Sequence, residues 1–308
     1  MSEAITGRVI QSTGSWYEVA QDPPGGEDPV IRCRLPGRFR QRDLDTTNPI
    51  SVGDRVSVTM NQDGTGSIEE IHDRENFVIR QATRSSHEEQ ILVSNIDRAY
   101  VVQSVLKPRL KQGFIDRFLV TCEAYGVPAA LVINKMDLAG GKERERISGL
   151  QDLYEELGYP VHLTTIKDSS SLEGLKAGLK GKTSVFIGPS GTGKSSIMNV
   201  LDPSVERKVG EVSDYNEKGK HTTTFARLVP LGIGGWLVDT PGIREFGLVN
   251  IAPWELSHYF PEMAEVHQQC KFNNCTHSHE PGCAVMEAYE DGHIHPDRYH
   301  SYLQILDS

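Results

Sequence analysis

The alternation of hydrophobic and polar positions divides the chain into three regions. In residues 5–79, short runs of β-branched and aromatic residues are separated by turn residues, which predicts a small barrel of five or so strands. Residues up to about 247 alternate apolar runs with helical patterns, as a doubly wound parallel sheet does. Beyond residue 250 the chain is rich in His, Cys and aromatic residues, which indicates a third module.

The expected elements can be located along the sequence. The number and size of the barrel runs suit an OB-type β-barrel, and the runs lie at residues 7–12, 15–20, 30–35, 54–60, 66–71 and 77–80. Apolar runs that predict buried parallel strands lie at residues 99–106, 129–133, 161–164, 184–187 and 236–238. Helical patterns lie around residues 114–125, 150–157 and 172–179. The fold expected is multidomain α/β plus β, with a barrel in residues 1–80, a doubly wound α/β domain in residues 81–247 and a helical module in residues 248–308.

Composition and charge narrow the class of protein. The chain has 308 residues, enough for two or three domains, and its 37% hydrophobic and 24% charged residues are ordinary for a soluble globular protein. Its longest apolar stretch, around residues 127–133, is too short to span a bilayer, so we expect a cytoplasmic protein without membrane contact. A net charge of −10 argues against indiscriminate nucleic-acid binding, and no DNA partner is expected. Any contact with RNA must be local.

A glycine-rich segment has the features of a phosphate-binding loop. It follows an apolar run and precedes a predicted helix, so backbone N–H groups and the helix N-terminus can face an anion. Lys194 supplies a positive charge to the outer phosphates and Ser195 a hydroxyl to Mg²⁺. The alternative is a glycine-rich turn without a ligand. The residues expected to contact nucleotide phosphates are Gly188, Pro189, Ser190, Gly191, Thr192, Gly193, Lys194, Ser195 and Ser196.

A second motif, Asn134-Lys135-Met136-Asp137, lies at the carboxyl end of another predicted strand, where open parallel sheets bind ligands. Asp137 can accept hydrogen bonds from N1–H and the exocyclic amine of guanine, whereas adenine would leave this carboxylate unpaired. Alone, these four residues are a weak signal. Beside a phosphate loop, they predict a guanine-nucleotide site.

Three further segments complete the expected nucleotide site. One ends a predicted strand with an aspartate suited to the Mg²⁺ environment and a glycine whose N–H senses the γ-phosphate. Another can place a backbone N–H near the guanine carbonyl oxygen. The third is a polar segment, residues 219–224, with threonines that can reach Mg²⁺. The residues concerned are Asp239 and Gly242 in the first segment, Thr165, Ile166 and Lys167 in the second, and Thr223 in the third.

The order of these motifs is unusual. An ordinary GTPase begins with its phosphate loop, whereas here the guanine motif at residue 134 precedes the phosphate loop at residue 188. With its flanking modules, the chain resembles the RsgA (YjeQ) family of circularly permuted, ribosome-associated GTPases. The permutation makes the segment after Gly242 lead into the third module, so we expect the nucleotide state to move or order that module.

The residue that orients the attacking water is missing from its usual place. Ile243 stands where many GTPases carry a glutamine, and an aliphatic side chain cannot orient water. We therefore expect slow intrinsic hydrolysis and a group supplied by a partner or by His221, which can equally be an ordinary loop histidine. The catalytic residues expected are Lys194, Thr223 and His221.

A cysteine and histidine cluster near the carboxyl end suits a tetrahedral Zn²⁺ site. Four protein ligands would leave no open position, so this Zn²⁺ should be structural and coupled to local folding. The residues alone leave His279 as a rival imidazole. The family resemblance implies a spacing that selects Cys270, Cys275, His277 and Cys283.

Basic residues concentrate in one stretch of the predicted barrel. Residues 31–42 hold five arginines and one aromatic residue, and strand alternation places Arg32 and Arg34 on one face. A solvated strand face is the alternative, but the barrel and the family resemblance favour an RNA-binding surface. Its expected residues are Arg32, Arg34, Arg38, Phe39, Arg40 and Arg42.

The expected activity is hydrolysis of GTP to GDP and phosphate with Mg²⁺. The resemblance implies a monomer that binds the small (30S) ribosomal subunit and its 16S rRNA, is stimulated there, and assists late subunit maturation. Two alternatives stay open: an RNA-binding scaffold with a structural nucleotide, and a permuted GTPase of RNA modification.

Overall fold

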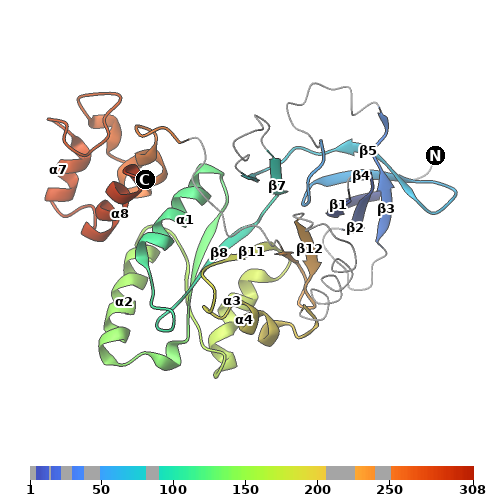
Figure 1. The fold of residues 1–308 in the computed structure, drawn as a ribbon, viewed down its shortest axis with the longest axis horizontal. Coiled ribbons are helices and arrows are strands. Elements are labelled where there is room, and N and C mark those ends of the chain that lie inside the picture. Colours follow the sequence, from blue (N-terminus) through green and yellow to red (C-terminus); the bar gives the residue numbers. More distant parts are fainter. Residues whose placement is uncertain are drawn as a thin grey trace.

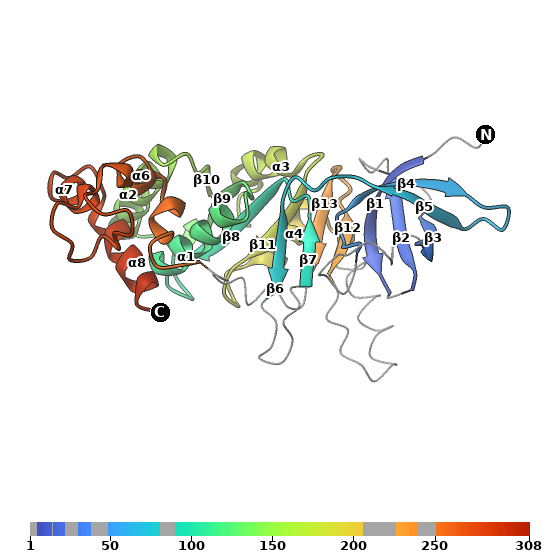
Figure 2. The ribbon, with the colours of Figure 1, turned by 90° about the horizontal axis from the view of Figure 1, so that it is seen from above.

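The computed structural model describes residues 5–13, 15–21, 30–37, 49–80, 90–205, 226–239 and 251–308. Three parts lie in a row: a barrel of strands, a central sheet with helices on both faces, and a helical module that contains the carboxyl end (Figures 1 and 2). The arrangement agrees with the expected multidomain fold. No helix in the described part of the chain is long and apolar enough to cross a membrane.

The barrel closes through five strands. These are β1 (Ile5–Ser12), β2 (Tyr17–Gln21), β3 (Ile31–Arg34), β4 (Arg55–Met60) and β5 (Gly66–Ile71). They pair in the order β1-β2-β3-β5-β4, and β4 returns to β1. Among these five described strands, β3 and β5 pair in parallel and the other pairs are antiparallel. Alternate side chains point inward, so Val9, Val19, Cys33, Val58 and Ile68 fill the barrel core.

The sixth predicted barrel run, residues 77–80, is not part of the barrel. It forms β6 (Phe77–Arg80), which pairs with β7 (Gln90–Ser94) in a separate two-stranded sheet. The cause is closure: β4 pairs with β1 along Ile5–Arg8, and β12 pairs with β1 at Gln11, so the edge of β1 is occupied by other strands.

The central sheet carries the strands predicted from apolar runs. In spatial order they are β10 (Val161–Leu163), β9 (Ala129–Asn134), β8 (Arg98–Ser104), β11 (Thr183–Ile187) and β13 (Trp236–Asp239), all parallel, followed by antiparallel β12 (Arg227–Pro230). The carboxyl ends of the parallel strands therefore meet at one edge. Strand β12 was not predicted.

Helices cover both faces of this sheet. Helices α1 (Gln112–Ala124) and α2 (Gly141–Glu156) pack on one face, and α3 (Glu173–Leu179) and α4 (Lys194–Leu201) pack on the other. The strands alternate accordingly: Val101 and Leu131 join the core below α1 and α2, whereas Val102 and Val132 join the core below α3 and α4.

The barrel and the central sheet are joined by backbone and side-chain hydrogen bonds. Strand β1 pairs antiparallel with β12, so the two parts share one continuous sheet. Buried Arg8 of β1 donates to the Thr183 hydroxyl and, at 3.2 Å, to the Asn95 carbonyl oxygen. A charge buried to this extent is costly unless hydrogen-bonded, so these contacts fix the junction beside the first residue of β11.

The carboxyl-terminal module packs on α1. Its helical elements are η5 (Leu256–Tyr259), α6 (Pro261–Ala264), η6 (His267–Gln269), α7 (Ala284–Glu290) and α8 (Pro296–Leu306), and its core also takes in Val120 of α1. Fully buried Arg298 of α8 donates to Asp116 of α1 at 2.7 Å and to Glu262 of α6 at 2.7 Å. Burial lowers the pKa of Arg298, but the two carboxylates outweigh that effect and raise it.

Removing Arg298 should loosen this module. Arg298→Met leaves Asp116 and Glu262 uncompensated in the interior, so we expect the free energy of opening of α8 to fall by about 3–5 kcal/mol. Native-state hydrogen exchange of α8 measures this quantity. The control is Arg117→Met on the same helix α1, whose contact with Ser308 is exposed and whose effect should stay within about 0.5 kcal/mol. Equal effects in the two variants would contradict a buried anchor.

Candidate functional site

The phosphate loop joins β11 to α4 in the predicted place. Gly188 lies so close to β8 that a Cβ there would overlap the Val102 carbonyl oxygen. Gly193 adopts φ +98°, in the left-handed region, and a Cβ there would strike the Asn134 amide. Glycine is therefore required at both ends of the loop, where the backbone turns tightly against the sheet.

Lys194 is held over this loop at the N-terminus of α4. Its ammonium donates to the carbonyl oxygens of Gly188 at 2.7 Å and Pro189 at 2.9 Å. The next residues, Ser195 and Ser196, are exposed on the first turn of the helix. A cation, two hydroxyls and the positive end of the helix dipole thus gather at one place, which suits an anion with an associated metal ion.

The guanine motif is tied to the phosphate loop by hydrogen bonds. Buried Asn134, the last residue of β9, donates through Nδ2 to the Thr192 carbonyl oxygen at 3.0 Å. Lys135, with φ +62°, donates through Nζ to the Gly191 carbonyl oxygen at 2.6 Å and to the Lys107 carbonyl oxygen. The two motifs therefore form one site although the sequence separates them widely.

The carboxylate of Asp137 is oriented by neighbours from the segment after β10. Thr165 Oγ1 donates to its Oδ1 at 2.7 Å, and Lys167 Nζ lies 2.6 Å from its Oδ2. These two contacts, that of Lys167 first, lower the pKa of Asp137. Asp137 is thus an anion at neutral pH and can accept two N–H donors. Ile166, between its two neighbours, is 47% exposed.

Asp239 ends β13, next to the strand that leads into the phosphate loop. Burial raises the pKa of its carboxyl group, and the charge of Arg227 on β12 opposes that shift. The other residues expected here, Gly242, Ile243, His221 and Thr223, lie outside the described part of the chain.

Two contributors to the site were not predicted. Thr164 donates through Oγ1 to Asn134 Oδ1 at 3.2 Å and accepts the Met136 N–H at 3.1 Å, which orients the guanine motif. Lys107, in the segment after β8, supplies the carbonyl oxygen that Lys135 contacts. Their signal is position: Thr164 is the last residue of one predicted strand and Lys107 directly follows another, at the sheet edge where ligands bind.

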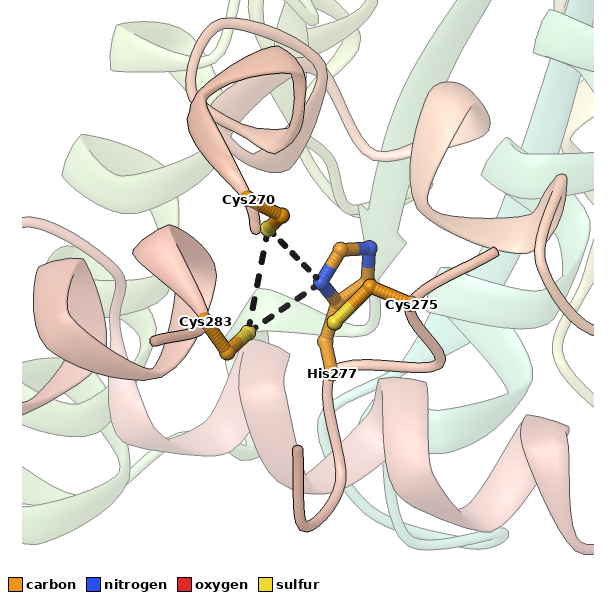
Figure 3. A group of neighbouring side chains, drawn as sticks. All are labelled: Cys270, Cys275, His277 and Cys283. Atoms are coloured by element: carbon orange, nitrogen blue, oxygen red, sulfur yellow. Dashed lines mark hydrogen bonds between the residues drawn. The ribbon is translucent and has the colours of Figure 1, made fainter. Parts of the chain in front are cut away.

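The four predicted metal ligands come together in the carboxyl-terminal module (Figure 3). The ligand atoms of Cys270, Cys275, His277 and Cys283 all lie within 4.8 Å of one another. His277 Nδ1 lies 3.3 Å from the Cys283 sulfur and 3.5 Å from the Cys270 sulfur. Three thiols and an imidazole at these distances fit a tetrahedral Zn²⁺ ion.

His277, and not His279, lies among the three cysteines. Its Nε2 lies 3.0 Å from Ser257 Oγ, which leaves Nδ1 facing the sulfurs. The Tyr299 hydroxyl donates to the His277 carbonyl oxygen at 2.7 Å. Burial lowers the pKa of His277 to about 4, so its imidazole is neutral at pH 7. His279, in contrast, is exposed and contacts the hydroxyl of Ser278.

The arginines of β3 lie on the outer face of the barrel. Arg32 and Arg34 are exposed, whereas Cys33 between them is fully buried. Their guanidinium carbons lie 4.8 Å and 4.0 Å from the ring centroid of Trp16, an aromatic residue that was not predicted to belong to this face. Arg38, Phe39, Arg40 and Arg42 lie outside the described residues.

Comparison with protein families and known proteins gives consistent matches. The model of the RsgA GTPase domain matches residues 71–249, and that of the RsgA N-terminal domain matches residues 6–68. The chain is 43% identical over 303 residues to Small ribosomal subunit biogenesis GTPase RsgA 2 of Bacteroides thetaiotaomicron, covering 98% of this chain and 96% of that protein. It is 40% identical to the RsgA of Flavobacterium johnsoniae, covering 98% and 93%.

Solved structures agree with these matches. YjeQ from Thermotoga maritima superposes with a TM-score of 0.79 at 34% identity, covering 99% of this chain and 98% of that one. YloQ, described as a circularly permuted GTPase, gives a TM-score of 0.77 at 30% identity, covering 99% and 94%. The chain therefore belongs to the RsgA family of GTPases, as its permuted motifs, its barrel and its cysteine cluster indicate.

Proposed function

We propose that this chain binds GTP with Mg²⁺ at the carboxyl ends of β9, β8 and β11, hydrolyses it to GDP and phosphate, and serves biogenesis of the small ribosomal subunit in the cytoplasm. One observation carries the proposal: Asn134 and Lys135 are hydrogen-bonded to the phosphate loop, which assembles a guanine-nucleotide site from permuted motifs. The names of the relatives support the ribosomal role.

In this proposal the residues have distinct tasks. Asp137 accepts N1–H and the exocyclic amine of guanine, and the exposed Ile166 segment borders the base. Lys194 and the loop N–H groups stabilise the phosphates, while Ser195, Thr223 and Asp239 hold Mg²⁺ or its water. The Gly242 N–H would sense the γ-phosphate. We assign the tasks to a G domain of residues 81–247 between the barrel and the carboxyl-terminal module.

Asp137→Asn should remove the preference for guanine. An amide offers one donor and one acceptor in place of two acceptors, so we expect GDP affinity to fall about 10–150-fold, which corresponds to one or two charge-assisted hydrogen bonds. Xanthosine diphosphate, which presents a carbonyl where guanine has its amine, should bind the variant better than GDP. Fluorescence titration with labelled nucleotides measures both affinities. Exposed Asp152→Asn on α2 is the matched control, and a preference unchanged from the native chain would exclude Asp137 as the base reader.

Turnover should depend on ribosomal subunits. We expect slow GTP hydrolysis by the chain alone and strong stimulation by small subunits but not by large ones, with Lys194→Ala as the blank. Phosphate release measures the rate. Stimulation by neither subunit would favour the scaffold with a structural nucleotide. Stimulation by another structured RNA would instead favour a role in RNA modification.

We further propose that the four ligands of the carboxyl-terminal module hold one structural Zn²⁺. Their convergent sulfur and nitrogen atoms, three of them from buried residues, fit this metal, and bound Zn²⁺ would cross-link segments that α8 already contacts. The exposed arginines and Trp16 of the barrel are proposed to contact 16S rRNA, and the protein is proposed to act as a monomer.

The two histidines give a matched test of the metal site. His277→Ala should lose most of the zinc measured by atomic emission and increase hydrogen exchange in residues 251–308. His279→Ala should keep one zinc per chain, because its imidazole is exposed and directed to Ser278. Zinc loss in His279→Ala alone would reverse the ligand assignment.

A further inference from the structure

The β12–β13 hairpin connects the nucleotide site to the barrel. Strand β13 pairs with β11, which leads into the phosphate loop, and β12 pairs with β1 of the barrel. In Figure 2 this hairpin stands between the central sheet and the barrel strands. The hairpin is therefore a direct strand-paired connection from β11 to β1.

A row of polar side chains crosses this junction. In the strand register, Asp239 of β13 lies opposite Arg227 of β12, and Arg227 lies opposite Gln11 of β1. Gln11 pairs with Glu18 of β2, and Glu18 with Arg32 of β3. All four pairings are antiparallel, and residues directly opposite in antiparallel strands project on the same face with Cβ atoms about 4.5–5.5 Å apart. The row runs acid, base, amide, acid, base, and it joins the proposed Mg²⁺ site to the proposed RNA face.

Arg227 is the member of this row that can shift between partners. It is half-buried, and its Nε is enclosed without a hydrogen-bond partner among the described residues. A guanidinium in this condition gains from any acceptor that its neighbours offer. Its neighbours in the row are an acid on one side and an amide on the other.

We propose that Arg227 is a positioning residue that shares Asp239 with Mg²⁺ and transmits occupancy of the nucleotide site to Arg32 on the barrel. The inference rests on the proposed function for the identity of the two sites. When the metal ion occupies the carboxylate, Arg227 turns toward Gln11 and Glu18. Glu18, which lies opposite Arg32 in the strand register, is then attracted to Arg227 as well, so Arg32 becomes more available to an RNA phosphate. By linkage, RNA bound at Arg32 strengthens nucleotide and Mg²⁺ binding by the same factor.

The test measures two quantities in purified full-length protein. One is the ratio of small-subunit affinities with a non-hydrolysable GTP analogue and with GDP. The other is the Mg²⁺ dissociation constant in the presence of the analogue. In the native chain we expect the affinity ratio to be at least about 5, within the usual range of coupling.

Arg227→Met should reduce this ratio to about 1, and Mg²⁺ should bind several-fold more tightly because its competitor for Asp239 is gone. Arg227→Lys retains the charge and should restore both values in part. Gln11→Leu removes one alternative partner of Arg227, so the ratio should fall and Mg²⁺ should bind more weakly than to the native chain, the opposite direction to Arg227→Met. Exposed Arg146→Met on α2 makes the same charge change outside the row and should alter neither quantity.

The outcomes separate this inference from the proposed function. If the native chain hydrolyses GTP on small subunits but Arg227→Met keeps the native ratio, the coupling row is wrong and the function stands. Weaker Mg²⁺ binding in Arg227→Met would also overturn the inference, because removal of a competitor for Asp239 should strengthen Mg²⁺ binding. Loss of packing alone would weaken it. If the native chain binds no guanine nucleotide, the proposed function itself fails.

Discussion

Strand β8 is the constraint on which the nucleotide site depends. It lies between β9, which ends in the guanine motif, and β11, which begins the phosphate loop. Two strand spacings of about 4.8 Å therefore separate the groups for base and phosphates, a distance that suits a nucleoside. Gly188 lies directly against Val102 of β8. Asn134 and Lys135 are hydrogen-bonded to the phosphate loop, so these contacts hold the two motifs at this distance. Chain order is then free to change, because the sheet and not the sequence places the motifs.

The two parts beside the G domain are attached by different physical means. The carboxyl-terminal module is anchored by Arg298, whose charge is fully buried and paired with two carboxylates and whose guanidinium lies 4.6 Å from the Phe260 ring centroid. Moving this anchor would leave charges unpaired in the interior, so the interface favours a single arrangement. The barrel is attached by a strand pair and by Arg8 at the first residue of β11.

Sequence patterns predicted what depends on local chemistry. The phosphate loop, the guanine motif, the parallel strands and the cysteine cluster each carry their signal in adjacent residues, and the structure brings these groups together. What was missed depends on pairing between distant segments. Residues 77–80 have an ordinary strand pattern, and it does not show that they pair with β7 and not with the barrel. The short strand β12 has a weak pattern, and Trp16 gains its arginine neighbours only through the pairing of β2 with β3.

The difference between the two attachments indicates where a change at the nucleotide site can be transmitted. A contact transmits a change only if it has two accessible arrangements of similar free energy. Arg298 does not meet this condition, because both of its partners are buried with it and its three hydrogen-bonding nitrogens are satisfied. In the proposed coupling Arg227 meets it, because it is half-buried and lies between an acid and an amide in the strand register. The proposed row therefore places an adjustable contact on the barrel side of the G domain, whereas the Arg298 contacts hold α8 against α1.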